Sequence, residues 1–257
     1  MGKVYLVGAG PGDPELLTVK AARLLARAEI VFHDSLVSPG VLRLIARDAE
    51  VINVGKRCGR KLLTQEEINS LLVAAGTKQE VVIRLKGGDP LIFGRAGEEI
   101  EALRNAGVDF EIVPGITAAL GAAAAAGISL TDRRAASQIV FSTFSRGAQS
   151  TAMDWGAITS TTTLALYMPG PDYAEVAYRL REGGLPGDLP CAIVSNASGT
   201  QQQIRRTTVA ELAHEEKLPA PALMIVGRVA AQRVQEISKA FWRSDVKGHE
   251  AHRPAVS

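Results

Sequence analysis

Short strand-like runs that alternate with helical runs constrain the fold of this chain more than any other feature. Five such strand-like runs occupy residues 4–7, 30–33, 51–54, 81–85 and 110–113. Between them, residues 18–27 place apolar side chains at helical spacing, and Thr64 with Glu67 has the capping-box pattern that opens a helix. Alternating strands and helices of this kind predict a mainly parallel sheet covered by helices.

A second series of strands follows an interruption at Pro114-Gly115 and an expected small-residue helix over residues 116–126. Its strand-like runs are residues 139–143, 163–168, 191–195, 204–208 and 223–226, and residues 173–182 and 209–216 have helical composition. We therefore predict two α/β domains, each a mixed, mainly parallel sheet flanked by helices. The expected bounds are residues 1–114 and 115–242, followed by a flexible polar tail over residues 243–257.

Composition places the chain among globular proteins, with 46% hydrophobic and 22% charged residues. No apolar stretch approaches the roughly 20 residues that span a bilayer. The N-terminus enters a strand at once, without the pattern of a signal peptide. Cys58 and Cys191 are isolated, so neither a disulfide framework nor a cysteine metal site is expected. These features predict a cytoplasmic protein with no metal and no membrane contact.

The charge is small in sum but uneven along the chain. A net charge of +2 argues against a general nucleic-acid surface. Basic residues nevertheless gather locally, at Lys56, Arg57, Arg60 and Lys61, and again at Arg84, Lys86 and Arg95. Such clusters suit a small polyanionic ligand, although a solvated basic loop explains the first group equally well.

Residues 84–95 combine the end of a strand, a glycine-rich turn and the approach to a helix. Gly87, Gly88, Asp89 and Pro90 lie where an open α/β sheet presents its ligand loop, beyond the carboxyl end of a strand. The segment of residues 84–95 is too long and too specific in its sequence to be an ordinary turn, so it predicts a binding site.

A second glycine loop, residues 7–14, follows the first strand as a dinucleotide-binding loop would. Asp34 also stands where a ribose-binding acid is expected. However, Asp13 occupies the position of the third glycine, Pro11 removes a backbone N–H, and Pro14 delays the helix. The loop therefore favours a ligand without a pyrophosphate over NAD or FAD.

Taken together, these motifs resemble those of the uroporphyrinogen-III C-methyltransferases, within the class III S-adenosylmethionine-dependent tetrapyrrole methyltransferases. The resemblance extends from about residue 3 to residue 230. The matching segments are residues 7–18, 34–39, 54–57, 84–95, 113–118, 167–168 and 195–197.

The resemblance implies an activity, a cofactor and an assembly. The family methylates uroporphyrinogen III at two pyrrole carbons, C2 and C7, and gives precorrin-2 by way of precorrin-1 for sirohaem and cobalamin synthesis. Two molecules of S-adenosylmethionine become S-adenosylhomocysteine. The family fold is a homodimer of two-domain subunits, with the ligand cleft between the domains.

The resemblance also implies the site residues. The methyl donor would contact Pro11, Gly87, Gly88, Asp89, Ile92, Thr117, Ala118, Met168 and Ala197. Glycines let the backbone approach a ligand closely. The plainer alternatives are a core position for Met168 and a helix N-cap for Thr117.

The acceptor carries a rim of carboxylates, for which guanidinium and ammonium groups are the natural partners. Lys56, Arg57, Arg84 and Lys86 are the expected partners, and Arg84 and Lys86 share one face of their strand. Asp34 is the candidate for contact with the pyrrole N–H groups or for proton handling. The alternative is that Asp34 caps the turn before Ser38-Pro39.

The sequence departs from the family pattern at three places. His33 replaces a tyrosine, residues 142–145 replace a Val-Thr-Gly-His stretch, and Met168-Pro169 replaces Met-Gly. The rival hypotheses are a methyltransferase for a later corrin intermediate, a nicotinamide oxidoreductase, and a tetrapyrrole-binding protein without turnover. The intact 86–95 loop argues against the first of these.

Overall fold

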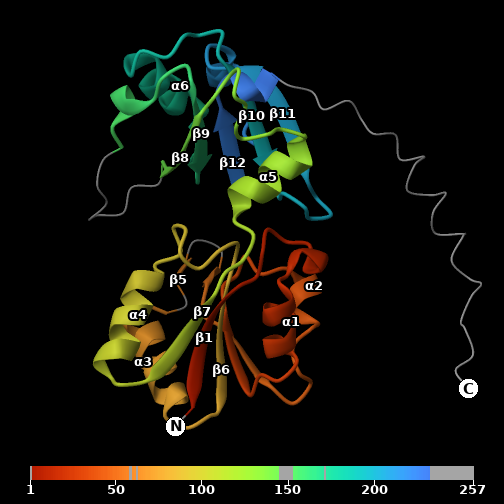
Figure 1. Ribbon diagram of the computed structural model, residues 1–257, viewed down its shortest axis with the longest axis vertical. Coiled ribbons are helices and arrows are strands. Elements are labelled where there is room, and N and C mark those ends of the chain that lie inside the picture. The colour runs from red at the N-terminus through yellow and green to blue at the C-terminus, as the bar shows by residue number, and fades with distance from the viewer. Residues whose placement is uncertain (1, 58–59, 62, 145–152, 171, 232–257) are drawn as a thin grey trace, which may run out of the picture.

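The chain forms two five-stranded β-sheets, one in each half of the sequence, stacked end to end and joined through residues 114–117 (Figure 1). The computed structural model describes residues 2–57, 60–61, 63–144, 153–170 and 172–231. We call residues 2–113 the N-terminal half and residues 114–231 the C-terminal half. The α/β fold class predicted from the sequence is confirmed, with helices against both sheets. The predicted tail over residues 243–257 lies outside the described residues.

The first sheet is parallel throughout and has the strand order β3-β2-β6-β1-β7. Its strands are β1 (Lys3–Gly8), β2 (Ile30–His33), β3 (Glu50–Asn53), β6 (Val81–Lys86) and β7 (Asp109–Val113). Helices α1 (Val19–Leu25) and α2 (Pro39–Leu42) pack against one face. Helices α3 (Gln65–Gly76) and α4 (Ala96–Asn105) cover the other. Side chains alternate between the two cores, as the period-two geometry of a strand requires.

The register of the first sheet brings its ligand loops to one edge. Gly8 at the end of β1 pairs with Lys86 at the end of β6, and His33 at the end of β2 pairs with Leu85. The loops that follow these three strands therefore emerge side by side, on the edge that faces the C-terminal half (Figure 1). Ligands of open α/β sheets bind at such an edge.

The second sheet has the order β11-β10-β12-β9-β8. Its strands are β8 (Gln138–Thr143), β9 (Thr162–Tyr167), β10 (Pro190–Ser195), β11 (Gln203–Thr208) and β12 (Ala222–Val226). Only β8 and β9 are parallel, and the other three pairs are antiparallel. The expected mainly parallel direction is therefore wrong for this sheet. A short loop returns the chain from β10 directly into β11, and a connection without a crossover helix makes neighbours antiparallel.

Helix α5 (Ala118–Ala126) covers one face of the second sheet, and α6 (Tyr173–Glu182) covers the other. The small residues of α5 serve close packing, as the sequence predicts. A Cβ atom at Gly121 would lie 2.6 Å from the Cβ of Pro11, in the first glycine loop of the other half. The glycine thus lets the two halves touch at this point.

Most predicted elements are present, and the differences are local. Thr64 and Glu67 form the predicted capping box of α3. The helix expected over residues 209–216 is instead the short 3-10 turn Glu211–His214. Helix α2 and the hairpin of β4 (Lys56–Arg57) and β5 (Arg60–Lys61) were not predicted. None of the helices in the described part of the chain has the length and apolar character needed to cross a membrane.

Candidate functional site

The backbones of two glycine loops are joined directly at the edge of the first sheet. Gly10 and Gly88 exchange backbone hydrogen bonds of 3.1 and 2.8 Å. The loop that leads into the C-terminal half crosses the same point, because a Cβ at Gly115 would lie 2.3 Å from the carbonyl oxygen of Gly88. A Cβ at Gly8 would likewise lie 2.6 Å from the Gly115 backbone, so the crossing requires glycine at both positions.

A cavity of about 210 Å³ lies over this crossing, between the two halves. All nine residues predicted to hold the methyl donor line it, from Pro11 in the first loop to Ala197 after β10. Asp34 lines the same cavity, together with apolar side chains from both halves. The remaining lining residues are Leu36, Phe93, Gly94, Tyr167, Val194, Pro221, Ala222 and Leu223.

Asp89 shapes this cavity through backbone contacts. One of its carboxylate oxygens accepts the N–H of Leu91 at 2.8 Å, and the other accepts the N–H of Gly115 at 2.9 Å. The side chain therefore ties the second glycine loop to the segment between the halves.

Thr117 and Tyr167 meet at the start of α5. The Thr117 hydroxyl lies 2.6 Å from the Tyr167 hydroxyl, which also accepts the Ala119 N–H at 3.2 Å. Thr117 is the N-cap residue by position, but its side chain makes no capping hydrogen bond. Burial raises the pKa of Tyr167, against the hydrogen bonds from Thr117 and Ala119. The Phe93 ring lies 4.9 Å from the Tyr167 ring, and neither aromatic was predicted as a site residue.

Met168 projects into the space between the halves instead of filling the core. Its side chain is well exposed, and its backbone is left-handed, with φ of 49°. Phe93 and Arg95, which also line the cavities, have φ of 51° and 57°. Left-handed backbone is unfavourable for residues with a Cβ and is concentrated at functional sites. The core alternative for Met168 is therefore wrong.

A second cavity, of about 400 Å³, adjoins the first within the N-terminal half. Asp34, Leu36, Phe93 and Gly94 line both cavities, so the two are continuous around them. The remaining lining residues of the second cavity are Ser35, Val54, Gly55, Leu63, Gln65, Ile68, Arg84, Lys86 and Arg95. The predicted acceptor residues Lys56 and Arg57 belong to the β4–β5 hairpin, but their side chains lie outside the described residues.

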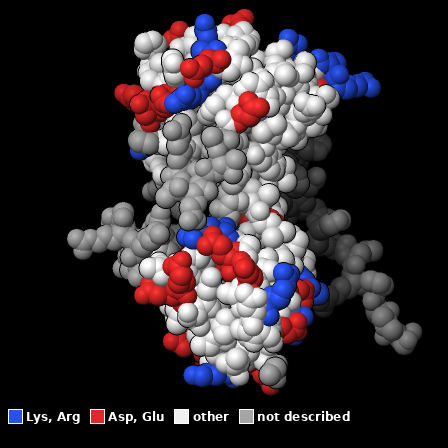
Figure 2. Space-filling view, turned by 90° about the vertical axis from the view of Figure 1, so that its left-hand side faces the viewer, with Lys and Arg blue, Asp and Glu red and all other residues white. Residues whose placement is uncertain are grey.

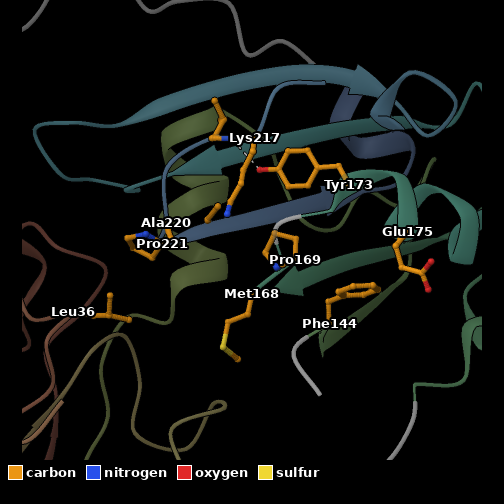
Figure 3. A pocket seen from close by; sticks show the side chains of 12 residues that line it. Leu36, Phe144, Met168, Pro169, Tyr173, Glu175, Lys217, Ala220 and Pro221 are labelled. Carbon is orange, nitrogen blue, oxygen red and sulfur yellow. Dashed lines mark hydrogen bonds between the residues drawn. The ribbon is translucent and has the colours of Figure 1, made fainter. Parts of the chain in front are cut away.

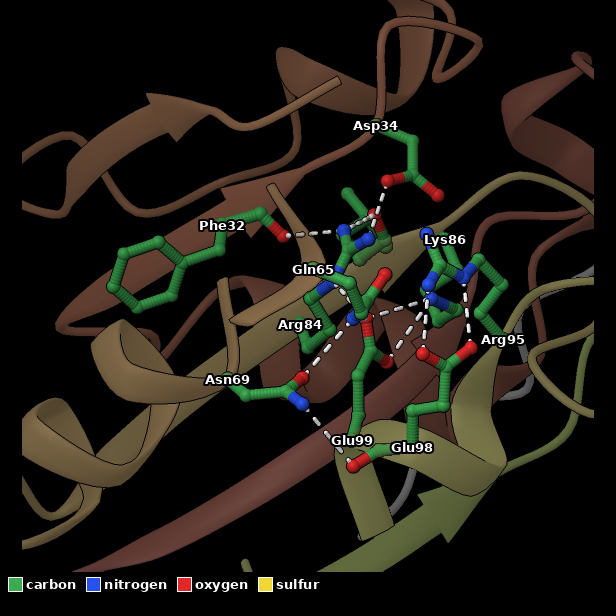
Figure 4. Close-up of polar contacts among 10 residues, drawn as sticks. Phe32, Asp34, Gln65, Asn69, Arg84, Lys86, Arg95, Glu98 and Glu99 are labelled. Atoms are coloured by element: carbon green, nitrogen blue, oxygen red, sulfur yellow. Dashed lines mark hydrogen bonds and ion pairs between the residues drawn. The ribbon is translucent and has the colours of Figure 1, made fainter. Parts of the chain in front are cut away.

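The basic side chains at the floor of the second cavity are held by protein carboxylates (Figure 4). Arg84 donates from Nη2 to Asp34 Oδ1 at 2.5 Å and from Nε to Glu99 Oε1 at 2.9 Å. Lys86 Nζ lies 3.0 Å from each oxygen of Glu99. Arg84, Lys86 and Glu99 are almost fully buried, whereas the Asp34 side chain is 30% exposed. We call these four residues the charge network. Arg84 and Lys86 share one strand face, as predicted.

The charge network shifts the two cations in opposite directions. Burial lowers the pKa of Lys86, and the neighbouring Arg84 lowers it further, against the attraction of Glu99. For Arg84, burial also acts downward, but the charges of Asp34 and Glu99 outweigh it and raise the pKa. Arg84 is thus the fixed positive charge of the group.

A third cavity, of about 740 Å³, shares the lining residues Leu36, Met168, Pro221 and Ala222 with the first cavity (Figure 3). Leu36 reaches it from the N-terminal half, and all its other lining residues come from the C-terminal half. Phe144 and Pro169 line it, so two of the departures from the family pattern face this space. His33, the third departure, is buried and contacts the Asp34 carbonyl through Nδ1 at 3.0 Å. Ser145 lies outside the described residues.

Outside the cavities, basic and acidic side chains lie next to one another on both halves of the face in Figure 2. Among the described residues, no group of three or more His, Cys, Asp or Glu side chains is placed to hold a metal ion.

Comparison with known proteins connects this geometry to a family. Residues 3–213 match the family model of the Tetrapyrrole (Corrin/Porphyrin) Methylases. The chain is 46% identical to the uroporphyrinogen-III C-methyltransferase of Paracoccus denitrificans, across 95% of this chain and 88% of that protein. It is also 46% identical to siroheme synthase 2 of Halorhodospira halophila, across 91% of this chain but only 48% of that longer protein.

Solved structures agree with the sequence comparison. The native uroporphyrin III C-methyl transferase from Thermus thermophilus superposes with a TM-score of 0.78 at 37% identity, over 89% of this chain and 98% of that one. Its complex with S-adenyl homocysteine gives the same values. The chain therefore belongs to the tetrapyrrole (corrin/porphyrin) methylase family.

Proposed function

We propose that this methyltransferase transfers methyl groups from S-adenosylmethionine to C2 and C7 of uroporphyrinogen III. The products would be precorrin-1 and then precorrin-2, for sirohaem or cobalamin synthesis. One observation carries the proposal: the nine donor residues expected from the motifs come from five separate stretches of the chain, yet all line one cavity. The name and the 46% identity of the Paracoccus denitrificans relative support the same acceptor.

The first cavity fits the methyl donor in shape and chemistry. Ile92, Ala118 and Ala197 offer apolar surface for an adenine ring, and Gly87 and Gly88 line the same cavity without a side chain. Gly88 has φ of 66°, a left-handed backbone conformation that residues with a Cβ rarely adopt. Glycine therefore lets the loop take the conformation that turns its backbone toward the cavity. The relative from Thermus thermophilus holds S-adenyl homocysteine, which supports this assignment.

The second cavity is the proposed acceptor site, because it adjoins the donor cavity and has a basic floor. Lys56 and Arg57 approach it along the chain from Gly55, which lines it. We propose that these two hairpin residues bind the acceptor carboxylates. Arg84 and Lys86 face the cavity too, but their charged groups already bind Glu99 and Asp34, so their role is to shape and polarise the floor.

When bound, S-adenosylmethionine supplies a methyl group on a positive sulfur that departs as a neutral thioether. The protein must align the pyrrole carbon with that methyl group and exclude water. Leu36, Phe93 and Met168 stand where the cavities join and provide apolar walls for this purpose. Arg84 binds one oxygen of Asp34, and the other points away from Arg84 (Figure 4). That oxygen is placed to accept a pyrrole N–H or a proton released from the ring.

An anaerobic assay tests the proposal. It combines the purified protein with enzymatically generated uroporphyrinogen III and labelled S-adenosylmethionine, and follows the mass of the tetrapyrrole. We expect a gain of two methyl groups. Donor binding without transfer would contradict the acceptor assignment and favour a later corrin intermediate. That alternative has some support, since the chain is 28% identical to the cobalt precorrin-4 methyltransferase CbiF, with a TM-score of 0.77.

The resemblance also supports three wider assignments. We propose a cytoplasmic homodimer whose subunits contain domains of residues 1–114 and 115–242. The chain passes from β7 of the first sheet into α5 through residues 114–117, which supports a boundary there.

A further inference from the structure

Glu99 is a fully buried carboxylate beneath the proposed acceptor cavity. It lies on α4 with no exposed surface, and it accepts from Arg84 Nε and from Lys86 Nζ. The amide of Gln65, at the start of α3, approaches Glu99 Oε1 at 3.4 Å. Nothing in the chemistry of methyl transfer requires an acid at this depth.

Burying Glu99 with two cations is costly, because each charge loses its hydration and well-packed apolar residues would hold β6 against α4 at least as well. Helix α4 already has such packing, through Ala96 and Leu103 in the apolar core. Holding β6 against α4 therefore does not by itself explain why the charged side chains of Arg84, Lys86 and Glu99 are buried. Arg84 and Lys86, the two cations that Glu99 binds, line the second cavity, so the buried group belongs to the proposed site.

The contacts of Arg84 show what Glu99 controls. Glu99 binds Nε, while Nη1 donates to the carbonyl oxygens of Phe32 and Leu85 at 3.4 and 3.3 Å. With these groups anchored, Nη2 points at Asp34 and binds its Oδ1 (Figure 4). Asp34 lines both the donor and the acceptor cavity. A planar guanidinium fixed at one edge holds its other edge in a fixed direction.

We propose that Glu99 is a positioning residue for methyl transfer, which acts through Arg84 to hold the Asp34 carboxylate at the junction of the two cavities. The inference rests on the proposed role of Asp34 in the reaction. Glu99 binds Arg84 and Lys86 beneath the cavity, so Asp34 is the carboxylate of the charge network that faces the proposed acceptor. Glu99 itself does not line either cavity.

The test compares Glu99→Gln with Glu101→Gln, an exposed position on the same helix. Glutamine keeps the volume of Glu99 and removes its charge. We expect Glu99→Gln to lower kcat for the tetrapyrrole at least tenfold, while the Kd of S-adenosylhomocysteine changes less than twofold. Glu101→Gln should match the wild type in both. A normal kcat in a folded Glu99→Gln protein would overturn the proposal.

A double-mutant cycle separates positioning from general stability. If Glu99 acts through Asp34, the Asp34→Asn/Glu99→Gln protein should be no more than threefold slower than Asp34→Asn alone. If the two substitutions acted independently, their fold-losses in kcat would multiply in the double variant, and that result would contradict the proposal. Glu99→Asp keeps the charge, so it should retain more activity than Glu99→Gln. Equal activities in Glu99→Asp and Glu99→Gln would also contradict the positioning role of Glu99. If Glu99→Gln does not fold, Glu99→Asp replaces it in the cycle.

A crystal structure of a Glu99 variant provides a readout that does not depend on the acceptor. We expect the 2.5 Å contact between Arg84 and Asp34 to lengthen beyond hydrogen-bonding distance. An unchanged contact would overturn the inference whatever the activity. A wild-type protein that fails to methylate uroporphyrinogen III would instead contradict the proposed function, while this structural comparison would still decide the role of Glu99.

Discussion

At the scale of single residues, the charge network gives Arg84 a part that differs from a free substrate-binding cation. Its N–H groups bind Asp34, Glu99 and two backbone carbonyls, and its side chain is almost fully buried. We therefore expect Arg84 to act on the proposed acceptor through Asp34 and through its charge. The donor cavity does not include Arg84, so its loss should leave donor binding intact.

Arg84→Ala should weaken use of the acceptor at least tenfold in kcat/KM, which is about 1.4 kcal/mol in the transition state. The Kd of S-adenosylhomocysteine, measured by calorimetry, should change less than threefold. Arg179→Ala provides the control, since it removes two surface ion pairs within α6, to Glu175 and Glu182. Equal losses of donor and acceptor binding in a folded Arg84→Ala protein would count against this assignment.

At the scale of elements, α5 connects the second sheet to the first glycine loop. Its run of alanines packs on the second sheet, and Gly121 faces Pro11 across the boundary between the halves. Helix propensity alone would favour alanine over glycine by about 1 kcal/mol within a helix. The close approach of Pro11 opposes that gain, because the two Cβ atoms would be 2.6 Å apart.

Gly121→Ala therefore tests which effect dominates. We expect a lower melting temperature and at least a fivefold weaker affinity for S-adenosylhomocysteine, because Pro11 lines the donor cavity. The control is Leu120→Ala at the neighbouring exposed position. If Gly121→Ala raised the melting temperature and bound the ligand normally, helix propensity would outweigh the contact and the packing argument would fail.

The element scale also shows the limits of local sequence patterns. The capping box of α3 and all ten predicted strands are present, because they depend on neighbours along the chain. The strand directions of the second sheet were wrong, since direction depends on the path between strands. Residues 209–216 have helical composition, yet the chain forms only a 3-10 turn there and then returns to β12.

At the scale of the whole molecule, the proposed donor site is shared between the two halves. Pro11, Gly88 and Asp89 line the cavity from one side, and Thr117 and Ala197 line it from the other. The halves also touch beside it, where the Asp13 N–H donates to the Ser198 hydroxyl at 3.3 Å. A ligand in this cavity should therefore stabilise both halves together.

S-adenosylhomocysteine at 100 times its Kd should raise the free energy of unfolding by about 2.7 kcal/mol and the melting temperature by about 5 to 10 °C. Thermal unfolding followed by calorimetry should show one transition that shifts as a whole. NAD at the same concentration should give no shift, since the first glycine loop lacks the phosphate-binding geometry. Two transitions, of which the ligand moves only one, would place the donor site within a single half.

The sequence by itself determined the α/β class and the positions of the strands, and it predicted nine residues that line one cavity. These features follow from local patterns, or from motifs long enough to be specific to a family. Only the tertiary structure decided that Met168 is exposed, that Tyr167 and Phe93 join the site, and that Glu99 holds Arg84 and Lys86. These contacts join residues distant in sequence or on different elements. Their geometry depends on how strands, helices and the two halves pack together, which no pattern along a single segment records.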